Sequence, residues 1–211
     1  MTPGPRRTKR RLLGIDRSGP PPAATLPGHP LHPWTIPNAI GYLRLAGIPA
    51  FVVVALSSRG GHDALAAVLF AAIGWADYLD GLTARVTGQY SRLGALLDPV
   101  IDRLLVLSGM AVAWRFDLLP RWALALVIVR EIVVLIMSRY ALRHGIELKI
   151  NWPGRLGVAP TMGAPFFAIV GVHWLALLML YVGLGLALLA TALYVRTGLA
   201  EVRARKLSSS D

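Results

Sequence analysis

Four aspartates within 26 residues have the clearest chemical potential in this sequence: Asp77, Asp80, Asp98 and Asp102. The first two are three residues apart and the last two are four apart. On a helix, either spacing puts both carboxylates on one face. Converging carboxylates repel one another unless cations neutralise them, and ligands that are all oxygen favour hard divalent ions such as Mg²⁺ or Mn²⁺. Because Mg²⁺ commonly joins carboxylates to substrate phosphates, the pattern predicts a metal-dependent site for a phosphate or pyrophosphate substrate.

The residues around the aspartates fit such a substrate. Gly81 and Ala84 are small and allow a backbone or a ligand to approach closely, and Gly94 has the same property. Arg85 can bind a phosphate. Two plainer interpretations remain open at this point. Small residues in a membrane helix often serve helix packing, and the acids could instead form ion pairs with Arg85, Arg92 and Arg103.

The composition indicates that a membrane must position these residues. The 211 residues are 55% hydrophobic and only 16% charged, whereas a soluble domain carries about 25% charge. No cysteine is present, which excludes disulfide frameworks, thiolate zinc sites and a cysteine nucleophile. The length suits one domain rather than two. The chain is therefore predicted to be an all-α, polytopic membrane protein.

Apolar stretches of spanning length predict six transmembrane helices with a tight hairpin near His173. The predicted spans are 38–57, 64–86, 93–114, 120–142, 156–173 and 175–195. Sixteen of the 22 Lys and Arg residues then fall on one side of the membrane. The positive-inside rule then predicts that both termini are cytoplasmic, which requires an even number of spans. The four carboxylates converge near the cytoplasmic surface, because a short loop makes the second and third spans antiparallel neighbours.

The sequence outside the spans is polar and rich in proline at its start. Residues 1–33 are predicted to form a disordered, basic, proline-rich cytoplasmic tail, 34–200 a membrane domain, and 201–211 a second cytoplasmic tail. The net charge of +11 is mostly explained by membrane topology and contact with anionic lipid. A basic arm for nucleic acid is disfavoured, because the rest of the chain has no soluble binding module.

The segment from Asp77 to Asp102 resembles the signature of the CDP-alcohol phosphatidyltransferases. All eight fixed positions of that signature match in type and spacing, and the resemblance extends over about residues 34 to 200. The segment Thr35-Ile36-Pro37-Asn38, followed by Arg44 and Pro49, resembles the family's entry segment. The matching signature positions are Asp77, Asp80, Gly81, Ala84, Arg85, Gly94, Asp98 and Asp102.

The resemblance implies phospholipid biosynthesis in the cell membrane. In this family, a hydroxyl attacks the β-phosphorus of a CDP-alcohol and CMP leaves. It implies that Asp77, Asp80, Asp98 and Asp102 hold Mg²⁺ or Mn²⁺, with two ions expected, and that Asp102 is the general base. The CDP moiety would contact Asn38, Arg44, Asp77, Gly81, Ala84, Arg85 and Gly94. The resemblance also implies a homodimer, with CDP-diacylglycerol and the lipid bilayer as its other partners.

The acceptor is expected to be phosphatidylglycerol, as in the cardiolipin synthases. Its phosphate is expected to contact basic residues beyond the motif, namely Arg130, Lys149 and Arg155. Phosphatidylglycerophosphate synthases usually have Gly-Lys-x-Lys-Thr where this chain has Gly154-Arg155-Leu156-Gly157-Val158. One cation fewer disfavours a compact phosphomonoester, so glycerol 3-phosphate is the alternative acceptor. Arg130 precedes Glu131 in the sequence and could equally form a local salt bridge.

Two other function classes account for the aspartates less well than the transferase does. A membrane prenyltransferase would need a second aspartate-rich motif later in the chain, and the acids after Asp102 form none. A metal-ion transporter would need polar residues deeper in the bilayer and has no use for Arg85 or Gly81 beside the acids. The residues therefore favour the transferase.

Overall fold

The computed structural model describes residues 22–26, 28–143 and 152–208, and within these ranges the chain is all helical. Six α-helices appear there, preceded by a short 3₁₀ helix, η1. Their bounds are η1 Ala23–Thr25, α2 Ile36–Ser57, α3 Ala64–Thr87, α4 Arg92–Arg115, α5 Arg121–Arg143, α6 Trp152–Val170 and α7 His173–Ser208. Each α-helix overlaps one predicted span, so the predicted all-α class is confirmed. Residues 1–21, which make up most of the predicted tail, lie outside the described residues.

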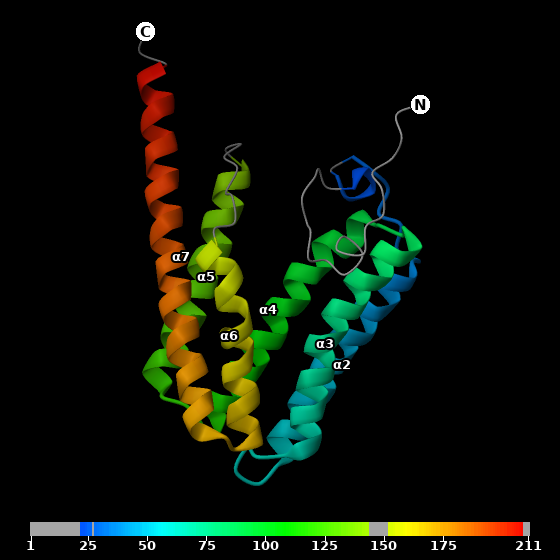
Figure 1. Cartoon of the computed structure of the whole chain (residues 1–211), viewed down its shortest axis with the longest axis vertical. Coiled ribbons are helices and arrows are strands. Elements are labelled where there is room, and N and C mark those ends of the chain that lie inside the picture. The colour runs from blue at the N-terminus through cyan, green and yellow to red at the C-terminus, as the bar shows by residue number, and fades with distance from the viewer. Residues whose placement is uncertain (1–21, 27, 144–151, 209–211) are drawn as a thin grey trace. The chain divides into compact units, whose positions relative to one another are not determined.

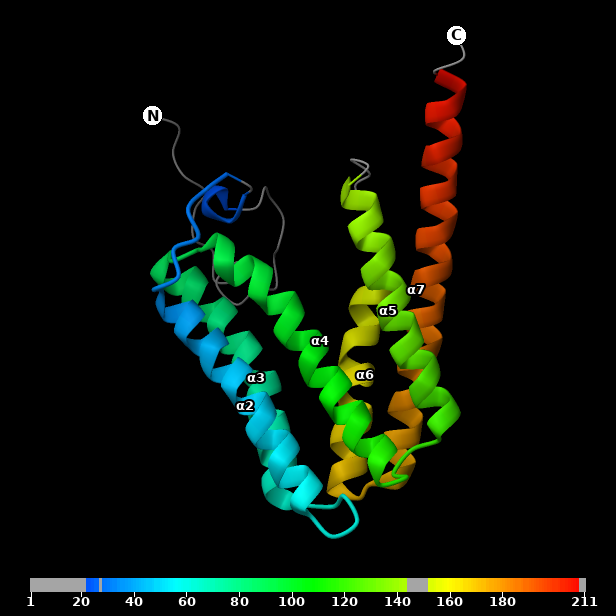
Figure 2. The ribbon, with the colours of Figure 1, turned by 180° about the vertical axis from the view of Figure 1, so that it is seen from behind.

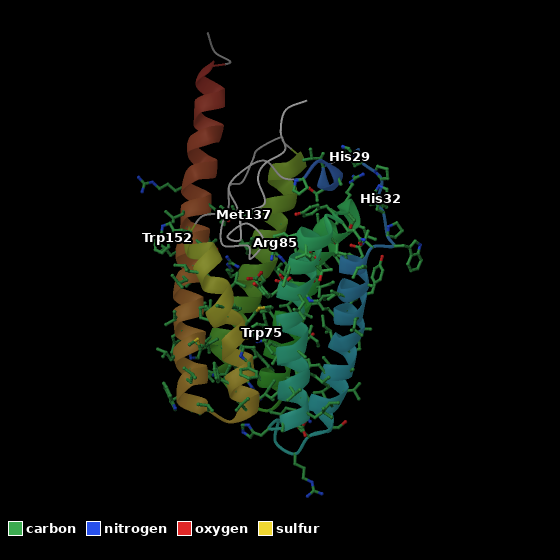
Figure 3. All side chains as sticks on the ribbon, turned by 45° about the vertical axis from the view of Figure 1, so that its right-hand side comes forward. His29, His32, Trp75, Arg85, Met137 and Trp152 are labelled. Carbon is green, nitrogen blue, oxygen red and sulfur yellow. The ribbon has the colours of Figure 1, made fainter. Side chains whose placement is uncertain are left out.

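Three of these helices are long and apolar enough to cross a membrane by length and composition: α2, α3 and the part of α7 from His173 to Arg196. Large apolar side chains remain exposed along the helices, such as Trp75 on α3, which is 71% exposed (Figure 3). Such surfaces suit lipid better than water. The chain is a membrane protein. That all six helices cross the bilayer stays a prediction.

The chain divides into two compact units, and the first contains the whole aspartate motif. It comprises residues 1–54 and 65–105, so α4 begins in this unit and ends in the other. Helices α2 and α3 run side by side in both ribbon views (Figures 1 and 2). Their contact includes the rings of Phe51 and Phe70, whose centroids are 5.2 Å apart, edge to face. Gly47 permits a close approach, since a Cβ there would lie 3.1 Å from Ile73.

The starts of α2 and α4 are fixed by hydroxyl caps. The hydroxyl of Thr35 accepts a hydrogen bond from the backbone N–H of Asn38, and that of Ser91 accepts one from Gly94. These bonds satisfy donors that the first turn of a helix otherwise leaves unpaired. The caps therefore set where both helices begin and how Asn38 and Gly94 face each other.

The second unit comprises residues 55–64 and 106–211 and is built on the pair α6 and α7. The chain reverses between them at Gly171, which has φ +90°. The N–H groups of Gly171 and Val172 donate to the carbonyls of Ala168 and Phe167, the pattern of a helix C-cap that needs glycine. The predicted hairpin near His173 is confirmed.

Candidate active site

Helices α2, α3 and α4 bring an arginine and three motif carboxylates into contact. The guanidinium of Arg44 on α2 donates from Nη1 to Asp77 Oδ1 at 3.0 Å and to Asp80 Oδ2 at 2.8 Å. Its Nη2 donates to Asp102 Oδ1 at 2.5 Å. The sequence predicted convergence of the aspartates. Ion pairs with Arg85, Arg92 and Arg103 were the alternative interpretation. Arg44 was expected to contact CDP, not to pair with the acids.

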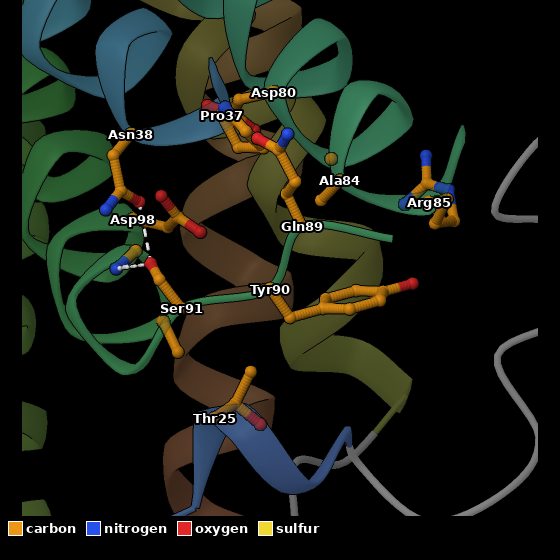
Figure 4. A pocket seen from close by; sticks show the side chains of 13 residues that line it. Thr25, Pro37, Asn38, Asp80, Ala84, Arg85, Gln89, Tyr90, Ser91 and Asp98 are labelled. Carbon is orange, nitrogen blue, oxygen red and sulfur yellow. Dashed lines mark hydrogen bonds between the residues drawn. The ribbon is translucent and has the colours of Figure 1, made fainter. Parts of the chain in front are cut away.

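The fourth carboxylate, Asp98, lies with Asp80 on the wall of a neighbouring cavity of about 180 Å³ (Figure 4). Five residues predicted to contact CDP also line it: Asn38, Gly81, Ala84, Arg85 and Gly94. The other two such residues, Arg44 and Asp77, are not among its lining residues. The cavity thus contains two carboxylates, a cation and several small residues, which is a chemical composition suited to a phosphate group and its metal ions.

Small residues of the motif have specific neighbours in this unit. A Cβ on Gly81 would lie 3.2 Å from Nη1 of Arg85, so the glycine leaves room for that guanidinium.

Pro99 on α4 has no N–H, and the helix therefore lacks the usual bond to the carbonyl of Ala95, which lines the cavity.

Gly94 has a structural task at the junction of α2 and α4. The side chain of Asn38 is buried there, donating from Nδ2 to the carbonyls of His32 and Pro33. Its Oδ1 accepts from the hydroxyl of Ser91 at 2.8 Å. A Cβ on residue 94 would lie 2.7 Å from that Oδ1 and 3.0 Å from Ser91 Oγ. Only glycine fits this approach without displacing a neighbour.

We therefore expect Gly94→Ala to destabilise the protein by about 1–3 kcal/mol, because the methyl group overpacks the junction. The thermal midpoint of purified protein in detergent measures this. Gly185→Ala is the matched control, since a Cβ there has nothing within 4 Å and alanine is the better helix former. Equal midpoints for the two variants would contradict the packing role.

Sequence reasoning missed several residues of this region. Thr25, Pro37, Gln89, Tyr90, Ser91 and Ala95 also line the cavity. Gln89 accepts the backbone N–H of Ile36 through its Oε1 and so links the loop before α4 to the start of α2. A serine directly before the start of an apolar helical segment is an N-cap signal, which could have found Ser91. Pro37 was noted only as part of the segment that resembles the family's entry segment, and nothing in the sequence pattern marked the others.

A second cavity of about 370 Å³ lies in the same unit and shares Gln89 and Tyr90 with the first. The remaining lining residues are His32, Pro33, Trp34, Thr35 and Gly88. Figure 3 shows His32 on the segment before α2 and Arg85 near the C-terminal end of α3. The described residues just before 34 thus belong to the surroundings of the motif, although the predicted domain boundary at 33 stays a prediction.

The predicted acceptor residues belong to the second unit. Arg130 on α5 pairs with Glu131 and donates from Nε to Thr191 Oγ1 on α7 at 3.3 Å. The local salt bridge that the sequence suggested is therefore present. Arg155 lies in the first turn of α6, and Lys149 lies outside the described residues. Contact of these three with an acceptor stays a prediction.

Gly157 is a packing residue in this unit. It is buried between α6 and α7, and a Cβ there would lie 3.3 Å from Cβ of Leu186. A side chain at this position would press on Leu186, so the glycine serves the close packing of α6 against α7.

Whether this site can bind a metal ion depends on the donor atoms that its side chains provide. No three or more His, Cys, Asp or Glu side chains of the described residues are arranged as a metal centre. Four carboxylates nevertheless belong to one site, and three of them share the guanidinium of Arg44. A surplus of oxygen donors and negative charge fits hard divalent cations.

A helical membrane fold with a carboxylate and arginine site of this kind defines a membrane enzyme that handles a phosphorylated substrate. Comparison with known proteins specifies the class: residues 34–196 match the model of the CDP-alcohol phosphatidyltransferase family, and the chain belongs to that family. It is therefore a phospholipid-synthesising transferase. The prenyltransferase and transporter hypotheses lose their support.

Similar proteins within the family carry different names. A Streptomyces coelicolor protein named cardiolipin synthase (CMP-forming) is 37% identical over 185 residues, 84% of this chain and 86% of that protein. A Bacillus subtilis protein named CDP-diacylglycerol–glycerol-3-phosphate 3-phosphatidyltransferase is 31% identical over 113 residues. The match covers 48% of this chain and 58% of the Bacillus protein. A Cereibacter sphaeroides protein of the same name is 32% identical over 105 residues, 48% of each chain.

Proposed function

We propose that this enzyme transfers a phosphatidyl group from CDP-diacylglycerol to phosphatidylglycerol, releasing CMP and forming cardiolipin. The observation that carries the CDP-alcohol part is the cavity between α2, α3 and α4, whose wall combines Asp80, Asp98 and Arg85 with small motif residues. Two further observations support this acceptor. The cardiolipin synthase from Streptomyces matches most of the chain, and Gly157 leaves the acceptor segment one cation short of the glycerol 3-phosphate pattern.

The reaction exchanges one phosphorus–oxygen bond for another. The hydroxyl oxygen of the acceptor attacks the β-phosphorus, the bond from that phosphorus to the CMP oxygen breaks, and CMP leaves with the electron pair. The hydroxyl proton passes to a carboxylate, which we assign to Asp102. Phosphoryl transfer needs positioning and charge neutralisation more than covalent help. Arg85 and the small residues of the cavity wall supply the positioning.

Asp77, Asp80, Asp98 and Asp102 are the residues that would hold Mg²⁺ or Mn²⁺, with two ions expected. When bound, such ions neutralise charge on the pyrophosphate and stabilise the leaving oxygen. Gly81 and Ala84 would then admit the substrate close to α3. Gly94 would contribute indirectly, by permitting the contact between Asn38 and Ser91.

The proposal extends to the enzyme's surroundings. We place it in the cell membrane with six crossings, both termini in the cytoplasm and the motif near the cytoplasmic surface. The distribution of Lys and Arg supports this orientation. A homodimer remains part of the proposal, with small-residue helix faces as its candidate contact.

Acceptor choice is tested by CMP release from CDP-diacylglycerol, measured with one acceptor at a time. Purified enzyme with Mg²⁺ or Mn²⁺ is given phosphatidylglycerol, glycerol 3-phosphate or myo-inositol phosphate. We expect release with phosphatidylglycerol alone and cardiolipin as the lipid product. Asp98→Ala serves as the blank for each acceptor.

Release with glycerol 3-phosphate would make this enzyme a phosphatidylglycerophosphate synthase, the alternative that the Bacillus and Cereibacter relatives favour. It would also show that the acceptor segment needs no second cation for that phosphate. No release above the Asp98→Ala blank with any acceptor would overturn the proposed donor.

A further inference from the structure

Arg44 is buried at the centre of the aspartate motif and uses most of its donors there. Its side chain is 1% exposed. Besides the bonds to Asp77, Asp80 and Asp102, its Nε donates to the backbone carbonyl of Ile73 at 3.1 Å. Four of the five N–H donors of the guanidinium are thereby engaged. A planar fork with fixed donor directions can serve several acceptors at once, which the ammonium of a lysine does less well.

The packing of α2 explains why this arginine reaches the acids. Gly47 lies one turn after Arg44 and lets α2 approach Ile73 closely, as described above. On the other side, Gly41 lies against Ile101 of α4, with a Cβ position 3.8 Å from its Cδ1. The bond from Arg44 to the Ile73 carbonyl then fixes the guanidinium to the backbone of α3. Its position is set by the fold as well as by the acids.

The charges of the site favour a permanent cation at this place. Four ionised carboxylates carry a charge of −4, and Arg44 reduces it to −3. The next two steps rest on the proposed function. Two divalent ions bring the charge of the site to +1. The pyrophosphate of CDP-diacylglycerol carries two negative charges and brings it to −1. Arg85 on the cavity wall adds one further positive charge. Without Arg44, the site would carry one more negative charge within the membrane domain, which is costly.

We propose that Arg44 is the internal counter-cation of the motif, a positioning residue that holds three of the four carboxylates together before any metal ion or substrate arrives. It engages one oxygen of each carboxylate, so the second oxygen of each can still serve as a metal ligand. This role differs from the CDP contact that the sequence suggested, and it agrees with the absence of Arg44 from the residues that line the cavity.

The test is the thermal midpoint of the purified full-length enzyme, measured in EDTA and again with Mg²⁺ or Mn²⁺. In EDTA, we expect Arg44→Met to melt about 10 °C below wild type, because three carboxylates lose their shared cation. Adding metal is expected to raise the midpoint of Arg44→Met more than that of wild type. Arg44→Lys, which keeps the charge but loses the fork, should fall in between. Arg121→Met is the matched control, since this exposed arginine pairs with the exposed carboxylate of Asp117.

The double variant Arg44→Met/Asp80→Asn removes one charge of each sign and covers the case in which Arg44→Met does not fold. We expect it to melt above Arg44→Met, or to yield folded protein where the single variant does not. A midpoint of Arg44→Met within about 2 °C of wild type in EDTA, with the same response to metal, would overturn the proposal. A large loss in Arg44→Met with no metal response in wild type would support Arg44 as counter-cation and count instead against the proposed metal site.

Discussion

Asp98→Asn is expected to lower the rate of CMP release at least about 100-fold while leaving the thermal midpoint within a few degrees of wild type. Asparagine keeps the shape of the side chain but removes its charge. Asp98 lies on the cavity wall beside Asp80, whereas Arg44 contacts the three other motif carboxylates. The loss therefore falls on the substrate and metal side of the site rather than on the ion pairs that join the helices.

This prediction is measured by kcat for CMP release together with the melting curve of the same preparation. Asp117→Asn is a suitable control, because that aspartate is exposed and lies outside the motif. Turnover close to wild type in Asp98→Asn would show that the reaction does not need the Asp98 carboxylate. It would also contradict the proposed role of the cavity.

Asp102→Asn is expected to lower kcat by about 100- to 10,000-fold, the range over which a general base contributes. The amide oxygen of asparagine can still accept the hydrogen bond that Asp102 Oδ1 now accepts from Arg44. The variant should therefore keep the contact between α2 and α4 but be unable to take the acceptor's proton. The substitution therefore separates two roles of Asp102, accepting a hydrogen bond and taking a proton.

Two measurements on Asp102→Asn separate these roles. The first is kcat with saturating acceptor, and the second is the rise in thermal midpoint on adding Mg²⁺ or Mn²⁺. We expect a low kcat with much of the metal response retained. If turnover stays near normal while metal still binds, Asp102 is not the base. If the metal response disappears, Asp102 acts chiefly as a ligand.

Local sequence accounts for much of the site. The i, i+3 and i, i+4 spacings of the aspartates were enough to predict that they share helix faces, because helix geometry is fixed within a few residues. Asp80, Asp98, Gly81, Ala84 and Arg85 accordingly line one cavity, as their positions in the motif led us to expect. The apolar stretches likewise placed all six helices, since burial in lipid requires long apolar segments.

The roles of Arg44, Gly94 and Gly157 could not be predicted in the same way. Arg44 lies 33 residues before Asp77, and only the packing of α2 on α3 shows that its guanidinium reaches the acids. Gly94 was predicted to contact the nucleotide and does line the cavity, but its close approach to Asn38 from another helix left no sign in the local sequence. Gly157 looked like a lost acceptor cation, and the structure shows it packed against α7.

Residue types and their short-range spacing were enough to identify the family, the helical membrane class and the candidate site residues. Which cation meets the carboxylates and which glycines serve packing became visible in the folded structure. Those answers depend on how closely two helices approach, and that distance is set by side chains far apart in the chain. Each such contact depends on the packing of many side chains at once, so a local sequence pattern does not reveal it.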